Sequence, residues 1–112
     1  MTGYEFGDVV LVPFPFTDHT TTKHRPAVII SSRTYHEHRP DVILMAITSQ
    51  LKPPSALGDL PVSAWQEAGL LKPSVIKPVM TTVDARLVIK KLGRLSAADC
   101  TTLKQVLREL LG

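Results

Sequence analysis

Apolar residues occur in short runs through most of the chain, and near its end they change to a helical spacing. The short runs are rich in β-branched and aromatic residues and are bounded by Gly, Pro, Ser and Thr, a pattern typical of strands. This pattern predicts strands at residues 8–16, 27–31, 42–47, 60–62, 74–77 and 87–89. Pro13 and Pro15 cannot donate to a ladder, so the end of the first strand should lie at a sheet edge or peel away.

The segments between these runs are polar. We expect loops or connections at residues 18–24, 35–41 and 52–55, and one irregular helical turn with Trp65 at residues 64–69. Ser96 is a good N-cap, and with Asp99 it resembles a capping box. A stripe at helical spacing follows, made of Leu103, Val106, Leu107, Leu110 and Leu111. The stripe predicts a C-terminal helix packed on the sheet, with partner binding as the alternative use of that face.

Several short strands followed by one helix favour a mainly β fold with a C-terminal helix, built as a small, strongly bent antiparallel sheet or barrel. The 112 residues fit one compact domain, residues 1–112. Cys100 is the only cysteine, and we expect it to pack as a small apolar residue rather than act as a nucleophile. The N-terminus is unlike a secretion signal, and no apolar run reaches the ~18 residues that span a membrane. These features favour a soluble, cytoplasmic protein.

Positive charge is concentrated in one part of the chain. The formal net charge is only +3, but residues 19–39 hold all four histidines and a single acid, Glu37. The cations of this stretch are Lys23, Arg25, Arg33 and Arg39. Such a stretch can form an electropositive surface for nucleic acid, although a solvated loop gives the same pattern.

Motifs for metals and cofactors are not found in the sequence. His36 and His38 are two residues apart, but no second pair completes a tetrahedral metal set, and a polar loop explains them better. The sequence lacks a GxGxxG, a P-loop, an HExxH and a nucleophile elbow. We therefore expect neither a metal nor a cofactor.

Two predicted strand ends carry residues suited to phosphate chemistry. Arg25 opens the second strand and Thr48 closes the third, so they meet at one rim of the sheet if these strands are antiparallel neighbours. An arginine can hold a phosphate with two parallel hydrogen bonds, and a hydroxyl can add a third donor. The alternatives are a surface charge at Arg25 and a strand-end hydroxyl bonded to backbone at Thr48.

Five segments, in order, resemble the MazF/PemK toxins of bacterial type II toxin–antitoxin systems. They are GDVVLV (residues 7–12), HRPAVIIS (24–31), AITSQ (46–50), GLLKPSVI (69–76) and LGRLS (92–96). The resemblance implies an SH3-like barrel of the CcdB/MazF type, a homodimer and an antitoxin partner. It also implies metal-independent cleavage of single-stranded RNA at preferred short sequences, in which Arg25 and Thr48 carry catalysis. The ribose 2′-OH would attack phosphorus, leaving a cyclic phosphate and a 5′-OH.

The sequence departs from the family pattern at two positions. Some members carry an acid five residues before the catalytic arginine, where this chain has Thr20, so His24 and His19 become the candidates for proton transfer. Many members have an arginine where Thr81 stands, and Lys77 is the candidate to replace its charge.

Further candidate RNA contacts are Lys23, directly before the segment 24–31, and Ser49 and Gln50, at the end of the segment 46–50.

The resemblance leaves two other functions open. One is a non-catalytic inhibitor of a protein target, because the gyrase poison CcdB resembles MazF toxins in fold. The other is an RNA-binding module without activity, which would bind RNA in a salt-sensitive way and form no product.

Overall fold

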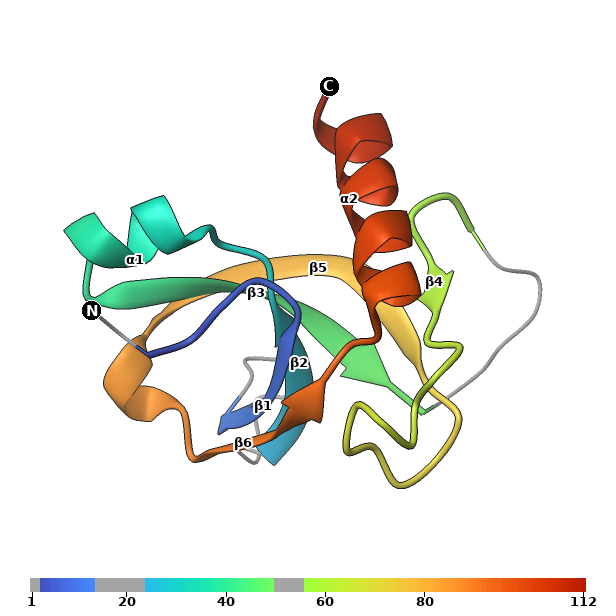
Figure 1. Cartoon of the computed structure of the whole chain (residues 1–112), viewed down its shortest axis with the longest axis horizontal. Helices are drawn as coiled ribbons and strands as arrows, with labels where there is room; N and C mark the ends of the chain where they lie inside the picture. The colour runs from blue at the N-terminus through green and yellow to red at the C-terminus, as the bar shows by residue number, and fades with distance from the viewer. Residues whose placement is uncertain (1–2, 14–23, 50–55) are drawn as a thin grey trace, which may run out of the picture.

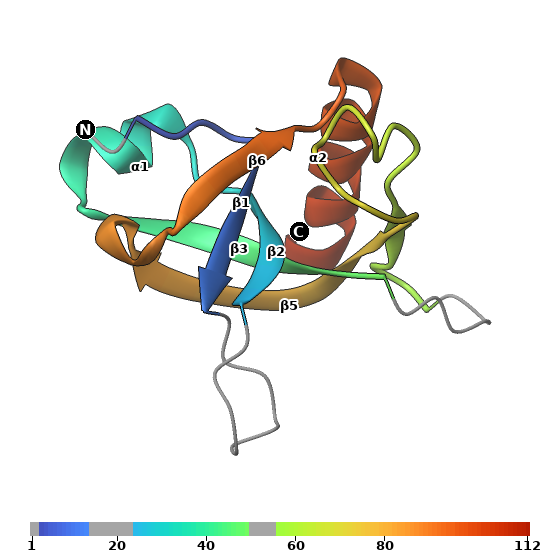
Figure 2. The same ribbon diagram turned by 90° about the horizontal axis from the view of Figure 1, so that it is seen from below.

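A computed structural model describes residues 3–13, 24–49 and 56–112 of the chain. Its elements are β1 (Asp8–Pro13), β2 (His24–Ile29), α1 (Arg33–His38), β3 (Asp41–Thr48), β4 (Leu60–Pro61), β5 (Val75–Asp84), the 3₁₀ turn η1 (Ala85–Leu87), β6 (Lys90–Arg94) and α2 (Ala97–Leu111). The strands form one antiparallel sheet in the order β4-β5-β3-β2-β1-β6, which curls strongly as Figures 1 and 2 show. The predicted bent antiparallel sheet with a C-terminal helix is confirmed.

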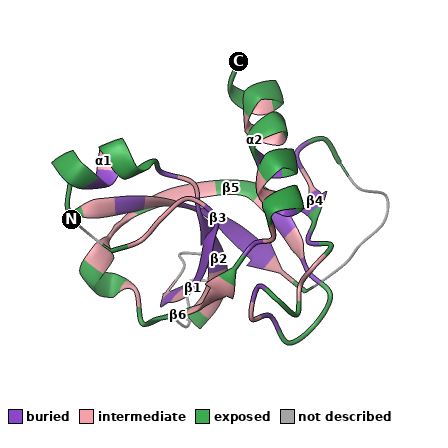
Figure 3. Cartoon of the chain, in the orientation of Figure 1, coloured by how far each residue is buried: buried purple, intermediate pink, exposed green. Residues whose placement is uncertain are grey.

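The two faces of the sheet bury separate apolar clusters because side chains alternate along each strand. One cluster includes Val9, Val28, Met45 and Ile76, and α2 contributes Leu103 to it. The other cluster fills the opposite face with Val10, Val12, Ala27, Ile29, Val42, Leu44 and Ala46. Figure 3 shows this burial concentrated in the central strands. The packed strands therefore hold the residues at their ends in fixed positions.

The C-terminal helix begins as predicted, but its first turn has an additional role. The side chain of Ser96 accepts a hydrogen bond from the backbone N–H of Asp99, so Ser96 is the N-cap. The Asp99 carboxylate is turned to the segment before β5, where it accepts from the Ser63 hydroxyl at 2.6 Å and from the Ala64 N–H at 3.1 Å. Burial alone raises the pKa of this carboxyl, but these hydrogen bonds lower the pKa overall. Asp99 therefore ties the predicted turn around Trp65 to α2.

The prediction of a polar connection at residues 35–41 is wrong in part, because this segment contains most of α1. The Ser32 side chain caps this helix by accepting from the N–H of Tyr35. His36 is only 3% exposed, and its ring nitrogens lie 2.5 Å from the Ser31 hydroxyl and 2.8 Å from the Tyr4 carbonyl oxygen. The buried residue of this short helix is thus a histidine, which an apolar pattern does not detect.

The predicted strand at residues 87–89 is also wrong, since Leu87 ends η1 and the next strand begins at Lys90. Leu87 and Ile89 are about half exposed. Strand β5 is longer than predicted, running to Asp84 through Pro78. Its register with β3 shifts around Pro78, and a proline is tolerated in a strand at such an irregularity.

The proline-containing end of β1 lies beyond the reach of β6. Leu11 is the last residue that β6 pairs, opposite Lys90, whereas Pro13 pairs only with His24 of β2. The end of β1 is therefore a local sheet edge, as Pro13 predicts. Pro15 and the rest of the predicted first strand lie outside the described residues.

Candidate functional site

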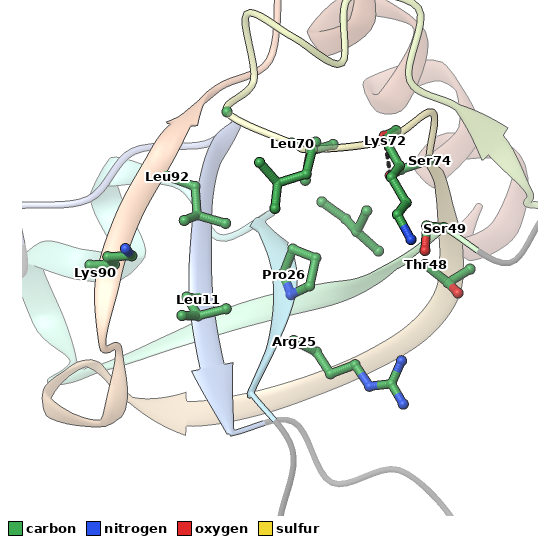
Figure 4. Close-up of a pocket in the computed structure, with 13 residues that line it drawn as sticks. Leu11, Arg25, Pro26, Thr48, Ser49, Leu70, Lys72, Ser74, Lys90 and Leu92 are labelled. Atoms are coloured by element: carbon green, nitrogen blue, oxygen red, sulfur yellow. Dashed lines mark hydrogen bonds between the residues drawn. The ribbon is translucent and has the colours of Figure 1, made fainter.

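A pocket of about 560 Å³ opens where β1, β2 and β3 meet β6 and the segment before β5 (Figure 4). Its lining residues are Leu11, Arg25, Pro26, Ile47, Thr48, Ser49, Gly69, Leu70, Leu71, Lys72, Ser74, Lys90 and Leu92. Three of them are cations and none is a carboxylate. The pocket is therefore suited to an anionic ligand with apolar groups.

Arg25 and Thr48 are brought together by strand pairing. Strands β2 and β3 are antiparallel neighbours, with Ala27 opposite Ala46. The pairing of β2 with β3 ends at Ala27, and the same register continued by two residues would set Arg25 opposite Thr48; both residues line the pocket. In Figure 4 their polar groups lie on the same side of the pocket. This is the arrangement that the sequence predicted for the two residues.

Lys72 and Ser49 extend the polar side of the pocket. Figure 4 shows the Lys72 side chain hanging from the upper wall toward Ser49 and Thr48. The hydroxyl of Ser74 donates to the Lys72 carbonyl oxygen at 2.8 Å, which fixes the backbone of this wall. Two positive side chains and two hydroxyls thus come from three separate segments to one side of the pocket.

The rest of the pocket is apolar, with Leu11, Pro26, Leu70 and Leu92 along it and Lys90 at the far side (Figure 4). The upper wall lies directly on β6 through two glycines. A Cβ on Gly69 would stand 2.1 Å from the Leu92 carbonyl oxygen, and one on Gly93 would stand 2.5 Å from the Ala68 carbonyl. Gly69 also has a φ of 81°, which favours glycine. The wall can approach β6 this closely only because both positions lack a side chain.

The other predicted site residues lie apart from this pocket lining. His24 is exposed at the start of β2, opposite Pro13. Lys77 on β5 forms an ion pair with Asp59 at 2.8 Å, and this hydrogen bond holds the pKa of the Asp59 carboxyl below its usual value. Thr81 lies opposite Leu44 of β3.

His19, Lys23 and Gln50 lie outside the described residues, as does Thr20. Among the described residues, no group of three or more His, Cys, Asp and Glu side chains is placed to hold a metal ion. The buried ring of His36 is engaged by Ser31 and Tyr4, so it holds α1 in place and does not belong to the polar loop expected for it.

Sequence reasoning did not select Lys72, Lys90 or the apolar residues of the pocket as site residues. Lys72 lies within the GLLKPSVI segment, which is the one signal that pointed to this wall. Lys90 lies on a strand whose position was predicted wrongly. Both residues reach the pocket through tertiary packing, which spacing in the sequence does not reveal.

An arginine, a lysine and two hydroxyls around one space can bind a phosphate and stabilise extra negative charge on it. The apolar surface beside them can pack against the faces of nucleobases. A single-stranded nucleic acid carries both groups at each nucleotide, so the pocket is chemically matched to such a strand.

Residues 5–111 match the family of PemK-like, MazF-like toxins of type II toxin–antitoxin systems. The chain belongs to this family. No curated protein matches it in sequence.

Solved structures share the fold at low sequence identity. The Mycobacterium tuberculosis toxin MazF-mt6 is 20% identical, with a TM-score of 0.72 over 91% of this chain and 93% of its own. A mycobacterial endoribonuclease in complex with its cognate antitoxin is 16% identical, with a TM-score of 0.77 over 98% of this chain and 96% of its own. MazF from Deinococcus radiodurans is 21% identical, with a TM-score of 0.74 over 97% of this chain and 96% of its own.

Neither helix in the described part of the chain has the length and apolar composition that a membrane-spanning helix needs.

Proposed function

We propose that the chain is the toxin of a type II toxin–antitoxin system and acts as an endoribonuclease that cleaves single-stranded RNA without a metal ion. The observation that supports this proposal most directly is the meeting of Arg25 and Thr48 in a pocket whose lining has three cations and no carboxylate. The family supports RNA cleavage as the activity, and the similar mycobacterial structure is itself an endoribonuclease. We infer that a phosphodiester occupies the polar side of the pocket and that adjacent bases lie on its apolar part.

In the proposed reaction the 2′-oxygen of the ribose attacks the adjacent phosphorus, and the bond from phosphorus to the 5′-oxygen breaks. A base removes the 2′ proton, and an acid protonates the leaving 5′-oxygen. The products are a 2′,3′-cyclic phosphate, which hydrolyses to a 3′-phosphate, and a 5′-OH. DNA lacks the nucleophile and would remain intact.

Arg25 is proposed to hold the phosphate through the two-pronged face of its guanidinium while negative charge builds on the non-bridging oxygens. Thr48 donates its hydroxyl to one of those oxygens, and Lys72 adds a positive charge on the same side. Arg25 is also proposed to deliver a proton to the leaving group, whereas an arginine side chain has only N–H donors and no acceptor for the 2′ proton. His24 and His19 are the proposed groups for proton removal. Lys23, Ser49, Gln50, Lys77 and Thr81 are proposed to contact RNA outside the reacting phosphate.

The test is cleavage of a mixed-sequence single-stranded RNA in excess chelator, with the product ends mapped. We expect discrete cuts that leave cyclic or 3′-phosphate ends. Arg25→Lys keeps the charge but loses the fork, and Thr48→Val keeps the shape but loses the hydroxyl, so each should slow cleavage by about 10²-fold. Thr48→Ser restores a hydroxyl and should recover most of the rate. Arg86→Lys, in an exposed ion pair with Asp84, is the matched control and should cleave like the wild type.

Each failure of this test points to a different function. A wild-type protein that arrests growth but leaves RNA intact would refute the nuclease in favour of a non-catalytic inhibitor of a protein target. Salt-sensitive RNA binding without products would favour a binding module instead.

The proposed partners are an antitoxin encoded beside the toxin and a second copy of the chain, in the cytoplasm. One of the similar structures is a MazE–MazF complex from D. radiodurans, and another is the endoribonuclease with its cognate antitoxin. Co-expression with neighbouring proteins should yield a stable complex that suppresses cleavage, and light scattering should give the mass of a dimer for the chain alone. A monomer that no neighbour inhibits would refute both partners.

A further inference from the structure

A second, smaller pocket of about 260 Å³ lies at the opposite end of β6 from Lys90. It is lined by Glu5, Phe6, Arg33, Arg94, Cys100 and Lys104. These residues come from the segment before β1 and from α1, β6 and α2, so four parts of the chain converge there. Three of the six are cations, and none of them belongs to the first pocket.

The charges around this second pocket leave a positive surplus. Lys91 joins the cluster through its ion pair with Asp8 at 3.2 Å, and Arg94 contacts the same carboxylate at 3.5 Å. Asp8 is only 1% exposed, so its charge is largely hidden behind these two cations. With Arg33 and Lys104 included, four cations face two carboxylates, Asp8 and Glu5. The exposed side of the cluster is therefore positive.

Glu5 positions Arg33 and Arg94 through ion pairs that engage only some of their N–H donors. Its two carboxylate oxygens bind Arg33 and Arg94, and these hydrogen bonds, first from Arg94 and then from Arg33, lower the pKa of Glu5, which keeps the carboxylate charged. Each of these ion pairs uses one terminal nitrogen of its guanidinium, whereas an arginine has five N–H donors. The two guanidinium groups are thus held in fixed positions with donors left for a phosphate.

Strand β6 connects the two pockets. On this outer strand of the sheet, Lys90 and Leu92 line the first pocket, and Arg94, two residues after Leu92, lines the second. Four residues of strand span about 13 Å. The register with β1 shifts between Lys91, which pairs with Val10, and Gly93, which pairs with Val9. This bulge at Leu92 turns Arg94 toward the same side as Lys91, where both reach Asp8.

The same features disfavour a peptide strand as the ligand of this edge. An added strand needs a regular ladder, whereas bulges and projecting lysines are the features that block pairing at sheet edges. A nucleic acid backbone needs only spaced positive charges and no ladder. The edge of β6 meets that requirement.

We propose that the RNA strand leaves the first pocket past Lys90, runs along the edge of β6, and places a flanking phosphate in the second pocket between Arg33, Arg94 and Lys104. This inference rests on the proposed function, because it assigns the route of the same substrate. The second pocket is a phosphate-binding subsite remote from the cleaved bond. It contributes binding energy that is equal in the ground state and the transition state, so it lowers KM and leaves kcat unchanged.

The test is the double variant Arg33→Gln/Lys104→Gln, which removes two exposed cations and leaves Asp8 with both of its partners. The matched control is Arg86→Gln/Arg108→Gln, which also removes two exposed cations, neither of which lines the first or the second pocket. Binding is measured by fluorescence anisotropy with uncleavable 2′-O-methyl oligonucleotides. One is short enough to fill the first pocket alone, and a longer one extends it at both ends. Cleavage of the corresponding RNAs is measured in parallel, and melting temperatures confirm that both variants are folded.

We expect the wild type and the control to bind the longer oligonucleotide more tightly than the short one. The double variant should lose this preference, and the magnitude of its slope of log K against log salt should fall by about 0.7, for one phosphate contact on a single strand. Its KM for long RNA should rise several-fold, with kcat and all values for short RNA unchanged.

The outcomes separate this inference from the proposed function. If the wild type cleaves RNA and the double variant keeps the wild-type KM and salt slope, the route along β6 is wrong and the nuclease stands. If the wild type cleaves nothing but shows the length-dependent binding that the double variant loses, the nuclease is wrong and the route stands. If the double variant binds RNA normally but no longer binds the antitoxin, the second pocket belongs to the protein partner and the RNA route is refuted.

Discussion

The contact between Gly69 and β6 allows a sharp test of how the pocket wall is held. In Gly69→Ala, the new Cβ would stand 2.1 Å from the Leu92 carbonyl oxygen and 2.5 Å from its carbon. Both atoms belong to the backbone of a paired strand, so they cannot rotate away as a side chain can. Alanine at a φ of 81° adds a backbone cost of its own.

The two costs can be estimated separately. A left-handed backbone costs a non-glycine residue roughly 1–2 kcal/mol, and forcing an extra methyl group into a packed site typically costs about 1–3 kcal/mol. The sum is roughly 2–5 kcal/mol, against a total stability of about 5–15 kcal/mol for a protein domain. At about 4 °C per kcal/mol for a domain near this size, the melting temperature should fall by roughly 8–20 °C.

Gly3 supplies the matched control. Its φ is 79°, nearly that of Gly69, but a Cβ built there meets nothing within 4 Å. Gly3→Ala therefore carries only the backbone cost, roughly 1–2 kcal/mol. Calorimetry of both variants separates the two contributions. Binding of the proposed RNA substrate reports on the pocket, since Leu70 and Lys72 must move with the wall. If Gly69→Ala has the same melting temperature as Gly3→Ala and binds RNA normally, the contact between Gly69 and the Leu92 backbone does not hold the pocket wall in place.

Three further predictions concern residues that support the site. Asp99→Asn should destabilise the protein at neutral pH by about 1.5–3 kcal/mol, because a neutral amide accepts more weakly from Ser63 and Ala64. The lowered pKa of Asp99 means that its stabilisation is present above the ordinary aspartate value of about 3.9 and is lost as pH falls through the lower folded value. Chemical denaturation should therefore show the difference from wild type shrinking in acid, and a pH-independent difference would contradict this account. Leu103→Ala, at a fully buried position of α2, should cost about 2–5 kcal/mol by the same assay, and a loss under 1 kcal/mol would show that α2 packs loosely. His36→Ala should cost about 2–4 kcal/mol and loosen α1, which faster amide exchange in α1 would reveal.

The central strands were predictable because their burial is recorded in their composition. Residues 42–47 are all apolar and form the middle of β3. The helical stripe and Ser96 likewise located α2. Knowing that β2 and β3 follow one another was enough to place Arg25 beside Thr48, because consecutive antiparallel strands set the start of one against the end of the next.

The parts that sequence reasoning missed are held by interactions that hydropathy does not record. Strand β6 reads as polar, KKLGR, because it pairs through its backbone while its lysines stay in solvent. The apolar run at residues 87–89 therefore looks more like a strand than β6 does, although Leu87 and Ile89 are exposed. Helix α1 depends on a capping serine and a buried histidine. Lys72 and Lys90 reach the pocket only because two glycines let distant segments touch, and the pattern of apolar positions does not encode such contacts.

The order of the strands also determines when the sheet can first close during synthesis of the chain. Strand β1 lies inside the sheet, with β2 on one side and β6 on the other, so the second neighbour of residues 8–11 is not made until residues 90–94. Until then the buried Asp8 carboxylate lacks Lys91 and Arg94, and one edge of β1 is open. At synthesis rates of about 5–20 residues per second, making residues 1–94 takes roughly 5–20 s. A nascent chain that stops before Lys90 cannot close the sheet or complete the pocket, so we expect the proposed nuclease activity to be absent until residues 90–94 have been translated.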